Sequence, residues 1–350
     1  YNSSSLALQG RQPLLSRELE SREALARLRA AQADALLAIR RADLARRLVD
    51  AWLDLVRAER QGAFLDDELA RQTALVDSAR KGLSSGEGTV TDLLEAGSRV
   101  ELLQAQRVAA QASRDDALDA LAVITGRRTG WARPGAAALP PERVPAAPTP
   151  GAIDAALPEH PQLRFRRLAL DMAREEVRLA RAGNASRLDW IASASRGDSD
   201  AVNSVNQVNR LWSAGVQFTL PLLDGGRADS GARAALALVD KAQAEFDDTE
   251  RSLQAEARQT LRALDSARER ALALQAARRS SVQLVSATQR SVGAGVRSRP
   301  DLLLAERQLA QVQREQDQAS IDQLRAWWRA TALQRQTPEA DLPLLEQALR

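Results

Sequence analysis

The sequence predicts a mainly α-helical fold with a small β part, built from two equivalent halves. Residues 4–121 and residues 212–330 follow the same plan at an offset of roughly 208. Each copy opens with an alternating segment that ends in Pro-Leu-Leu, continues through a long helical stretch, and turns back at a glycine-bearing loop. A repeat of this length exceeds the about 20–50 residues of a solenoid unit. It therefore indicates two equivalent halves of one object.

The composition favours long helices over a thick globular core. Only 3% of the 350 residues are aromatic, and Ala, Leu, Arg, Gln, Glu and Asp dominate, which is typical of long helices or coiled coils. The net charge of +3 comes mostly from arginines interleaved with acidic residues. Such a surface is either a nucleic-acid surface or a solvated helix face with i, i+4 pairs, and the interleaving favours the second. Because no basic run with aromatics occurs, we expect no nucleic-acid partner.

Two long runs are free of helix breakers. Residues 14–80 hold no proline and one interior glycine, Gly62, and residues 227–290 hold no proline and one early glycine, Gly231. A helix of about 65 residues would reach about 100 Å. Apolar residues, many of them alanine, recur at helical spacing in both runs, so we expect each helix to pack closely against partner helices.

Each run ends at a glycine-bearing turn, in residues 82–88 and 293–300. Glycine ends a helix through a left-handed cap, and proline suits the first turn of the next helix. We therefore expect return helices at about 89–125 and 299–336. Each half then consists of a strand followed by a long antiparallel helical hairpin.

Three segments alternate between apolar and polar residues, as strands with one apolar face do. They are residues 5–12, 187–196 and 211–220, and the polar stretch 196–210 is expected to form a long exposed hairpin loop. Three short strands do not make a stable sheet alone. They belong either to a membrane barrel shared by several chains or to a soluble α+β protein with a small sheet.

A proline-rich joint separates the halves. Residues 131–161 contain eight of the thirteen prolines. The joint is either a disordered linker or an irregular ordered band packed on the helices, and apolar residues that could anchor it favour the band. A helix at about 159–185 should follow. The candidate anchors are Trp131, Leu139, Ile153 and Leu157.

The sequence offers no residues for catalysis. The chain has no cysteine, which excludes thiolate metal sites and disulfides, and its only histidine, His160, lies in the proline-rich joint, where we expect a structural role. Gly225 and Gly226 form a turn into a helix rather than a phosphate cradle. No run of 18 apolar residues occurs that would predict a transmembrane helix. We predict no enzymatic activity, no catalytic residues, no cofactor and no metal site.

The chain resembles the TolC family of outer-membrane factors. Three features carry the resemblance over nearly the whole chain. They are the strand-to-helix junction Pro-Leu-Leu-Asp-Gly-Gly-Arg at 221–227, the turns at 86–94 and 295–303 that each contain Asp-Leu-Leu, and Leu-Ala-Val-Ile-Thr-Gly at 121–126. The turn sequences and the Arg-rich, Lys-poor composition are similar to outer-membrane components of type I toxin or protease secretion, such as adenylate cyclase toxin exporters.

The resemblance implies a homotrimer in the outer membrane of a Gram-negative bacterium. Each protomer would give four strands to a 12-stranded β-barrel and long helices to a periplasmic tunnel. Roughly 100 residues with the first strand would then precede Tyr1. The implied plan is a barrel strand at 1–13, a helical hairpin at 14–125, a proline-rich equatorial segment at 126–160, a helix at 161–186, a barrel hairpin at 187–221, a second helical hairpin at 222–336 and a C-terminal equatorial segment at 337–350.

The implied function is a passive exit duct of a tripartite export system. Its partners would be a periplasmic adaptor, an inner-membrane ABC or RND transporter, and outer-membrane lipid. Type I protein secretion is the first expectation, and a multidrug or metal efflux pump is the alternative. A coiled-coil scaffold without a pore is the competing class. Trp190 and Trp212, near the ends of the expected strands, argue against a scaffold, because aromatic side chains gather at membrane interfaces.

The resemblance also implies a gate at the helical tips. Arg297 would be the latch, with Thr91 and Asp92 as acceptors on a neighbouring hairpin, since a guanidinium can meet a carboxylate and carbonyl oxygens. An ordinary surface ion pair at a helix turn is the alternative. Val292 stands where the family has a latch tyrosine, and it cannot donate a hydrogen bond from its side chain.

Asp301 would form an acidic ring at the constriction, where a threefold set of carboxylates favours cations. The family often has a second acidic ring, but Leu304 occupies that position, which makes the second ring apolar. The alternative is that Asp301 simply caps the helix that begins beside Pro300.

Overall fold

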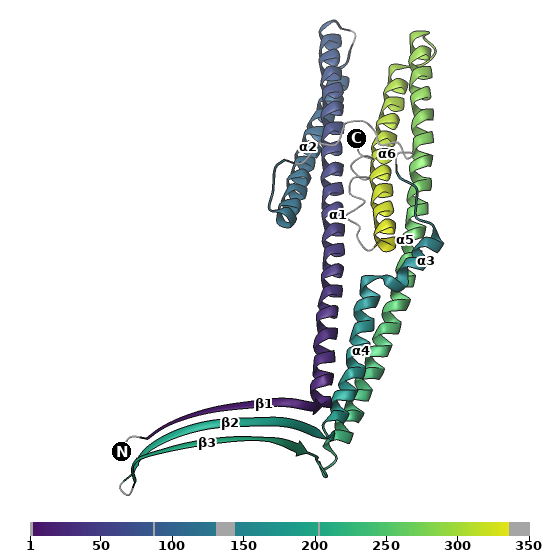
Figure 1. Cartoon of the computed structure of the whole chain (residues 1–350). Coiled ribbons are helices and arrows are strands. Elements are labelled where there is room, and N and C mark those ends of the chain that lie inside the picture. Colours follow the sequence, from purple (N-terminus) through teal and green to yellow (C-terminus); the bar gives the residue numbers. More distant parts are fainter. Residues whose placement is uncertain (1–2, 87, 131–143, 202–203, 336–350) are drawn as a thin grey trace. The chain divides into compact units, whose positions relative to one another are not determined.

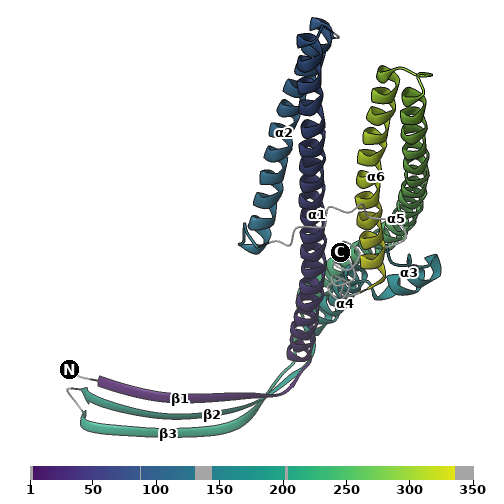
Figure 2. The ribbon, with the colours of Figure 1, turned by 90° about the horizontal axis from the view of Figure 1, so that it is seen from above.

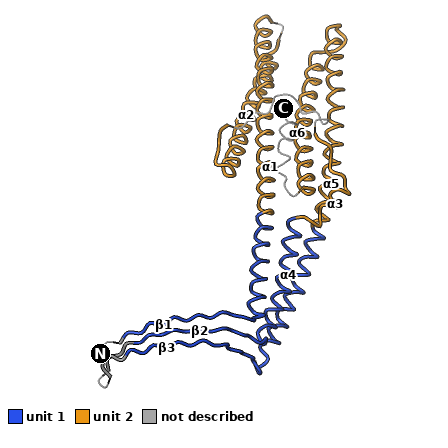
Figure 3. The backbone as a smooth tube through the Cα atoms, viewed as in Figure 1, with its two compact units in different colours: residues 1–37, 161–252 blue, residues 38–160, 253–350 orange. Residues whose placement is uncertain are grey.

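The computed structural model describes residues 3–86, 88–130, 144–201 and 204–335. It is mainly helical with a three-stranded antiparallel sheet (Figure 1). The chain divides into unit 1, Tyr1–Leu37 with Pro161–Ser252, and unit 2, Ala38–His160 with Leu253–Arg350 (Figure 3). None of the helices in the described ranges has an apolar stretch long enough to cross a membrane.

Unit 1 contains the sheet, in the order β1-β2-β3 with both pairs antiparallel. Two views agree that the strands lie side by side (Figures 1 and 2). All three strands were predicted, but each is longer than the sequence indicated, and β1 ends three residues later than the expected boundary at 13. They are β1 Ser3–Ser16, β2 Arg187–Ala201 and β3 Ser204–Thr219.

The expected loop at 196–210 is wrong. Most of this stretch is strand, and Arg196 pairs with Arg210 and Gly197 with Asn209. The ladder is made by backbone groups, so polar side chains do not interrupt it, and the stretch contains no proline that would remove a donor. The polar composition therefore does not mark the end of pairing.

The predicted apolar face of the sheet is confirmed. Leu188 lies opposite Phe218, and Trp190 lies opposite Val216, so these side chains share one face. On the other face the hydroxyl oxygens of Ser193 and Ser213 lie 2.8 Å apart. Phe218 remains 63% exposed. The described residues of the chain thus leave the apolar face uncovered.

The helices of unit 1 lie at one end of the strands (Figures 1 and 3). Asp224 caps the entry to α5, because its carboxylate accepts from the Gly226 and Ala228 amides at 3.0 and 2.7 Å. Gly225 and Gly226 adopt φ of 65° and 80°, which confirms the turn predicted there. Arg166 on α4 pairs with Glu245 on α5 at 2.6 Å. The three helices are α4 Pro161–Ala182 and the first parts of α1 Arg17–Ser84 and α5 Arg227–Gly293.

Unit 2 contains the two predicted hairpins from Ala38 of α1 and Leu253 of α5 onward. The long helices α1 and α5 have 68 and 67 residues, which confirms the predicted rods. Their return helices are α2 Val90–Thr125 and α6 Arg299–Gln334. The end of α6 falls two residues before the expected boundary at 336.

The main apolar core of unit 2 joins α1 to α6. Val49 and Leu53 on α1 pack in one cluster with Leu324 and Trp328 on α6, and each is at most 2% exposed. A second cluster joins α1 to α2, where Leu55 packs with Ala117 and Leu121. Helix α1 therefore lies between the two return helices and holds both.

The described part of the proline-rich joint is ordered and packed on unit 2. It contains α3 Pro150–Ala156 and the 3₁₀ helix Leu157–Glu159, and the anchor Ile153 is fully buried. The indole N–H of Trp327 donates to the carbonyl of Ala146 at 3.2 Å. This favours the ordered-band interpretation. The anchors Trp131 and Leu139, and the expected segment 337–350, lie outside the described residues.

His160 lies directly after the 3₁₀ helix, and its backbone N–H donates to the Leu157 carbonyl at 3.0 Å. Burial lowers the pKa of its imidazole. A single neutral imidazole in a packed joint agrees with the structural role predicted for it.

The α1–α6 core gives a testable stability prediction. Trp328→Ala should lower the free energy of unfolding by about 3–5 kcal/mol, because it removes a large side chain that is 1% exposed and leaves a cavity. Denaturant unfolding in detergent, followed by helical circular dichroism, measures this loss. The control is Val123→Ala, since Val123 is 88% exposed. Equal losses for the two variants would contradict the packing described.

A candidate gate at the tips of the helical hairpins

The first tip lies between α1 and α2 and is closed by a capping box. The backbone N–H and the hydroxyl of Thr89 donate to the Asp92 carboxylate at 3.1 and 2.7 Å. In return, the Asp92 amide donates to the Thr89 hydroxyl at 3.1 Å. This reciprocal arrangement satisfies two of the free amides at the start of a helix. The Thr89 hydroxyl bond is the main cause that lowers the pKa of Asp92.

The second tip repeats this arrangement between α5 and α6. The backbone N–H and the hydroxyl of Ser298 donate to the Asp301 carboxylate at 3.0 and 2.8 Å. These bonds, with a smaller contribution from the charge of Arg297, lower the pKa of Asp301. The structure thus agrees with the alternative that Asp301 caps its helix. A cap does not exclude a place in a ring, because only one carboxylate oxygen, Oδ2, accepts these two bonds.

The predicted latch is not assembled within one chain. In the described ranges no hydrogen bond or ion pair joins the Arg297 side chain to Thr91 or Asp92. Arg297 and Thr91 are exposed, and Leu304 is 67% exposed. Val292 lies on the last turns of α5 and is half-buried. All these residues are therefore at the tips, as predicted, with surfaces free for a neighbouring molecule.

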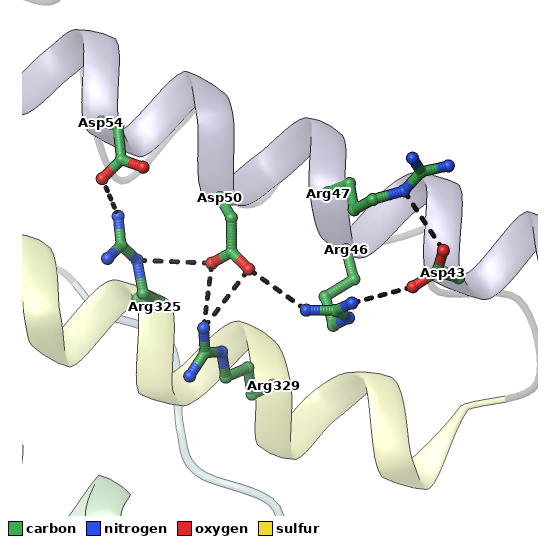
Figure 4. A network of polar contacts seen from close by, with 7 residues as sticks. All are labelled: Asp43, Arg46, Arg47, Asp50, Asp54, Arg325 and Arg329. Atoms are coloured by element: carbon green, nitrogen blue, oxygen red, sulfur yellow. Dashed lines mark hydrogen bonds and ion pairs between the residues drawn. The ribbon is translucent and has the colours of Figure 1, made fainter. Parts of the chain in front are cut away.

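A ladder of ion pairs fixes how α1 lies against α6 (Figure 4). Arg325 reaches Asp50 at 3.3 Å and Asp54 at 2.5 Å, and Arg329 also reaches Asp50 at 3.3 Å. Arg57, one turn further along α1, pairs with Asp322 at 2.6 Å. The sign of the charge on α1 changes between Asp54 and Arg57, so a shifted register would bring like charges together.

The ladder ends at a more buried pair. The guanidinium of Arg60 lies 3.8 Å from the carboxylate of Asp317, with side-chain exposures of 10% and 33%. Burial lowers the pKa of Arg60 and raises the pKa of Asp317, and the opposite charge of each partner offsets part of the effect. A groove of about 630 Å³ between α1, α2 and α6 opens beside this pair.

Sequence reasoning missed the whole ladder. The spacing of Asp50, Asp54 and Arg57 at i, i+4 and i+7 places them on one face of α1, and this could be predicted from the sequence. The helix that faces them could not be predicted. That depends on the register between two segments about 270 residues apart in the chain.

The two predicted interface tryptophans share the apolar face of the sheet, with exposures of 45% for Trp190 and 86% for Trp212. Trp190 lies near the helical end of β2. Trp212 is not near a strand end, because β3 begins at Ser204 and Trp212 pairs with Ala194 in mid-strand. The prediction of its place was wrong for the same reason as the expected loop.

On the opposite face the sheet holds a buried carboxylate that was not predicted. Asp189 on β2 is fully buried and pairs with Arg11 on β1 at 2.5 Å and with Arg187 at 2.9 Å. Both guanidiniums satisfy a carboxylate that would be costly to bury alone. In the described part of the chain no group of three or more acidic or histidine side chains could hold a metal ion.

The fold, the one-sided sheet and the long hairpins define a class of outer-membrane channel. The family described as "Outer membrane efflux protein" matches residues 152–333. The chain belongs to this family, the TolC type of outer-membrane efflux channel. Members of this family are non-enzymatic transport components. As a member, the chain is an outer-membrane protein of Gram-negative bacteria.

Two curated relatives resemble nearly the whole chain. The alkaline protease secretion protein AprF of Pseudomonas aeruginosa is 32% identical over 343 residues, which cover 95% of this chain and 70% of AprF. The proteases secretion protein PrtF of Dickeya chrysanthemi is 28% identical over 325 residues, which cover 91% of this chain and 69% of PrtF.

A solved structure shares the fold. The open state of the Neisseria gonorrhoeae MtrE outer membrane channel superposes with a TM-score of 0.76, covering 96% of this chain and 81% of that one, at 19% identity.

The capping boxes predict an acid-sensitive tip. Both carboxylates have a pKa below the ordinary 3.8, so their contribution to folding is complete above 3.8 and is lost as pH falls through the lower folded values. Amide hydrogen exchange, corrected for intrinsic rates, should therefore speed up in the first turns of α2 and α6 at about pH 2 relative to neutral pH. The first turn of α4, which has no acidic residue, should change less. Equal changes in the three helices would contradict the prediction.

Proposed function

We propose that this chain is the outer-membrane exit duct of a type I protein secretion system. The observation that carries the proposal is the extent of its likeness to AprF and PrtF, whose names record protease secretion and which align with over 90% of the chain. The duct is a passive conduit. It works with a periplasmic adaptor and an inner-membrane transporter of the ABC class, which selects the cargo.

The duct is a homotrimer whose protomers share one 12-stranded barrel. The open edges of β1 and β3 and the exposed apolar face support this, because edge strands need a partner and an apolar face needs lipid. From the level of Leu188 to the level of Arg196, eight residues further on, the apolar face extends about 26 Å along the strand. That span fits the about 25 Å apolar band of outer-membrane barrels.

The helical hairpins continue the barrel as a periplasmic tunnel that is closed at its tips. In the gate, Arg297 of one hairpin meets Thr91 and Asp92 of a hairpin on a neighbouring protomer. Asp301 and Leu304 line the constriction as one acidic and one apolar ring. The exposure of these residues and the spare oxygen of each capping carboxylate support such contacts. An exposed pair contributes only about 0–1 kcal/mol, so a docking partner can open the gate.

The cargo is tested by deleting the gene. The proposal predicts that at least one protein disappears from the culture medium, accumulates in the cell, and returns when the gene is restored on a plasmid. Susceptibility to drugs and metal ions should stay unchanged. An unchanged set of secreted proteins with increased drug susceptibility would instead support an efflux pump and would overturn the proposed cargo.

The gate is tested by single-channel recording in planar bilayers. Arg297→Ala should raise the conductance several-fold, because it removes the charge that holds neighbouring tips together. Arg299→Ala is the matched control, since it removes an exposed arginine two residues away that has no role in the latch. A conductance for Arg297→Ala that equals that of the parent and the control would remove the latch assignment.

A further inference from the structure

The two halves of the chain correspond with an offset of 209 in the helical hairpins. The capping boxes give this value directly, since Thr89 corresponds to Ser298 and Asp92 to Asp301. Burial agrees with it along the hairpins. The buried pairs are Leu55 and Leu264, Gln72 and Ser281, Ala110 and Ala319, and Leu121 and Ala330.

Because the halves correspond, the observed packing of α1 on α6 predicts an equivalent packing of α5 on α2. Within a chain, α1 packs on α6, which belongs to the other hairpin. By the repeat, α5 corresponds to α1, and α2 corresponds to α6. The outer face of α5 should therefore pack on an α2 that follows it, and in a closed ring that helix belongs to the next copy of the chain.

The observed seam between α1 and α6 is apolar at its centre. The ion pairs Arg57–Asp322 and Asp54–Arg325 set an antiparallel register. In this register Leu53 lies within two residues of the level of Leu324, and Val49 within two residues of the level of Trp328. All four belong to one buried cluster.

The corresponding positions on α5 and α2 are charged and complementary in sign. Val49 and Leu53 correspond to Arg258 and Arg262, and Leu324 and Trp328 correspond to Asp115 and Asp119. Both arginines are exposed and form no ion pair in the described ranges. Asp115 and Asp119 keep side-chain exposures of 49% and 56% despite local contacts with Arg114 and Arg128.

We propose that α5 of one copy packs against α2 of the next copy, with Arg258 beside Asp119 and Arg262 beside Asp115. The inference rests on the proposed trimeric duct and names the residues that join its protomers. Because the two surfaces differ, the contact is heterologous, and such contacts close into a ring when the rotation between copies permits.

The charges of the seam also favour packing of α5 against α2 over packing of α5 against α6. A hairpin that placed Arg258 and Arg262 against the apolar face of α6 would leave two arginines without partners, which is costly. The seam within a chain has an apolar centre that salt does not screen, whereas the seam between copies depends on exposed charges that salt screens. Assembly of the ring should therefore weaken with salt while the fold of each chain persists.

Charge reversal in the full-length protein tests the proposal. At low ionic strength in mild detergent, Asp115→Arg with Asp119→Arg should reduce the trimer fraction at least fivefold, as measured by light scattering after gel filtration. Arg258→Asp with Arg262→Asp should do the same. Combining all four substitutions should restore the trimer to within twofold of the parent. The control Glu256→Arg reverses an exposed charge on α5 that lies about 160° around the helix from Arg258 and about 120° from Arg262, and it should leave the trimer intact.

A cross-linking experiment covers the case in which a reversed variant does not fold. The sequence has no cysteine, so Arg258→Cys with Asp119→Cys places the only thiols of this region at the proposed contact. A short bis-maleimide should then yield dimers and trimers on denaturing gels, and neither single variant should yield trimers.

The outcomes separate the two proposals. A parent that is trimeric, with charge-reversed variants that remain trimeric and thiols that do not cross-link, would overturn this contact and leave the duct standing. A parent that is monomeric in the membrane would overturn both.

Discussion

A sheet with one uncovered apolar face is the constraint on which the rest of this structure depends. Apolar side chains of this face keep much of their surface exposed, with 63–86% for Leu6, Leu8, Trp212 and Phe218. Exposing a continuous apolar surface of this kind to water costs free energy. The edges of β1 and β3 carry unpaired backbone groups as well. Lipid against the face and further strands at both edges meet the two demands together, which is how outer-membrane barrels are built.

The helical hairpins are long and narrow, so only thin apolar contacts can hold their helices together. They are low in aromatic residues and rich in alanine, and α1 is held by a narrow apolar seam to α6 and by another to α2. Ion pairs beside the first seam fix the register rather than adding much stability, because exposed pairs contribute little. Register matters here, since it sets where the two tips lie along the axis of the proposed tunnel.

The sequence was sufficient for most features that depend on local pattern. Proline-free helical periodicity located α1 and α5, and the glycine-bearing turns located the tips. The Thr-x-x-Asp and Ser-x-x-Asp spacing made the capping role of Asp301 foreseeable as an alternative. Local pattern failed at 196–210, where strand pairing continues through polar residues.

What the sequence could not give depends on contacts between distant segments. The Arg57–Asp322 pair and the burial of Asp189 by Arg11 require a register or a strand order that no local window contains. The same holds for the proposed gate. Its residues were placed at the tips by resemblance, yet Arg297 meets neither Thr91 nor Asp92 in the described part of one chain, so the proposed latch requires a neighbouring chain.

The most direct test of the account is the environment of alternate residues on β3. Because the sequence has no cysteine, single spin labels can be placed in turn at residues 211–218 of the protein in lipid vesicles. The account predicts a period of two, in which labels at the even positions are relaxed by oxygen dissolved in lipid and labels at the odd positions by a water-soluble nickel chelate. Labels that respond alike along the strand, or only to the chelate, would show that the apolar face does not meet lipid and would contradict the account.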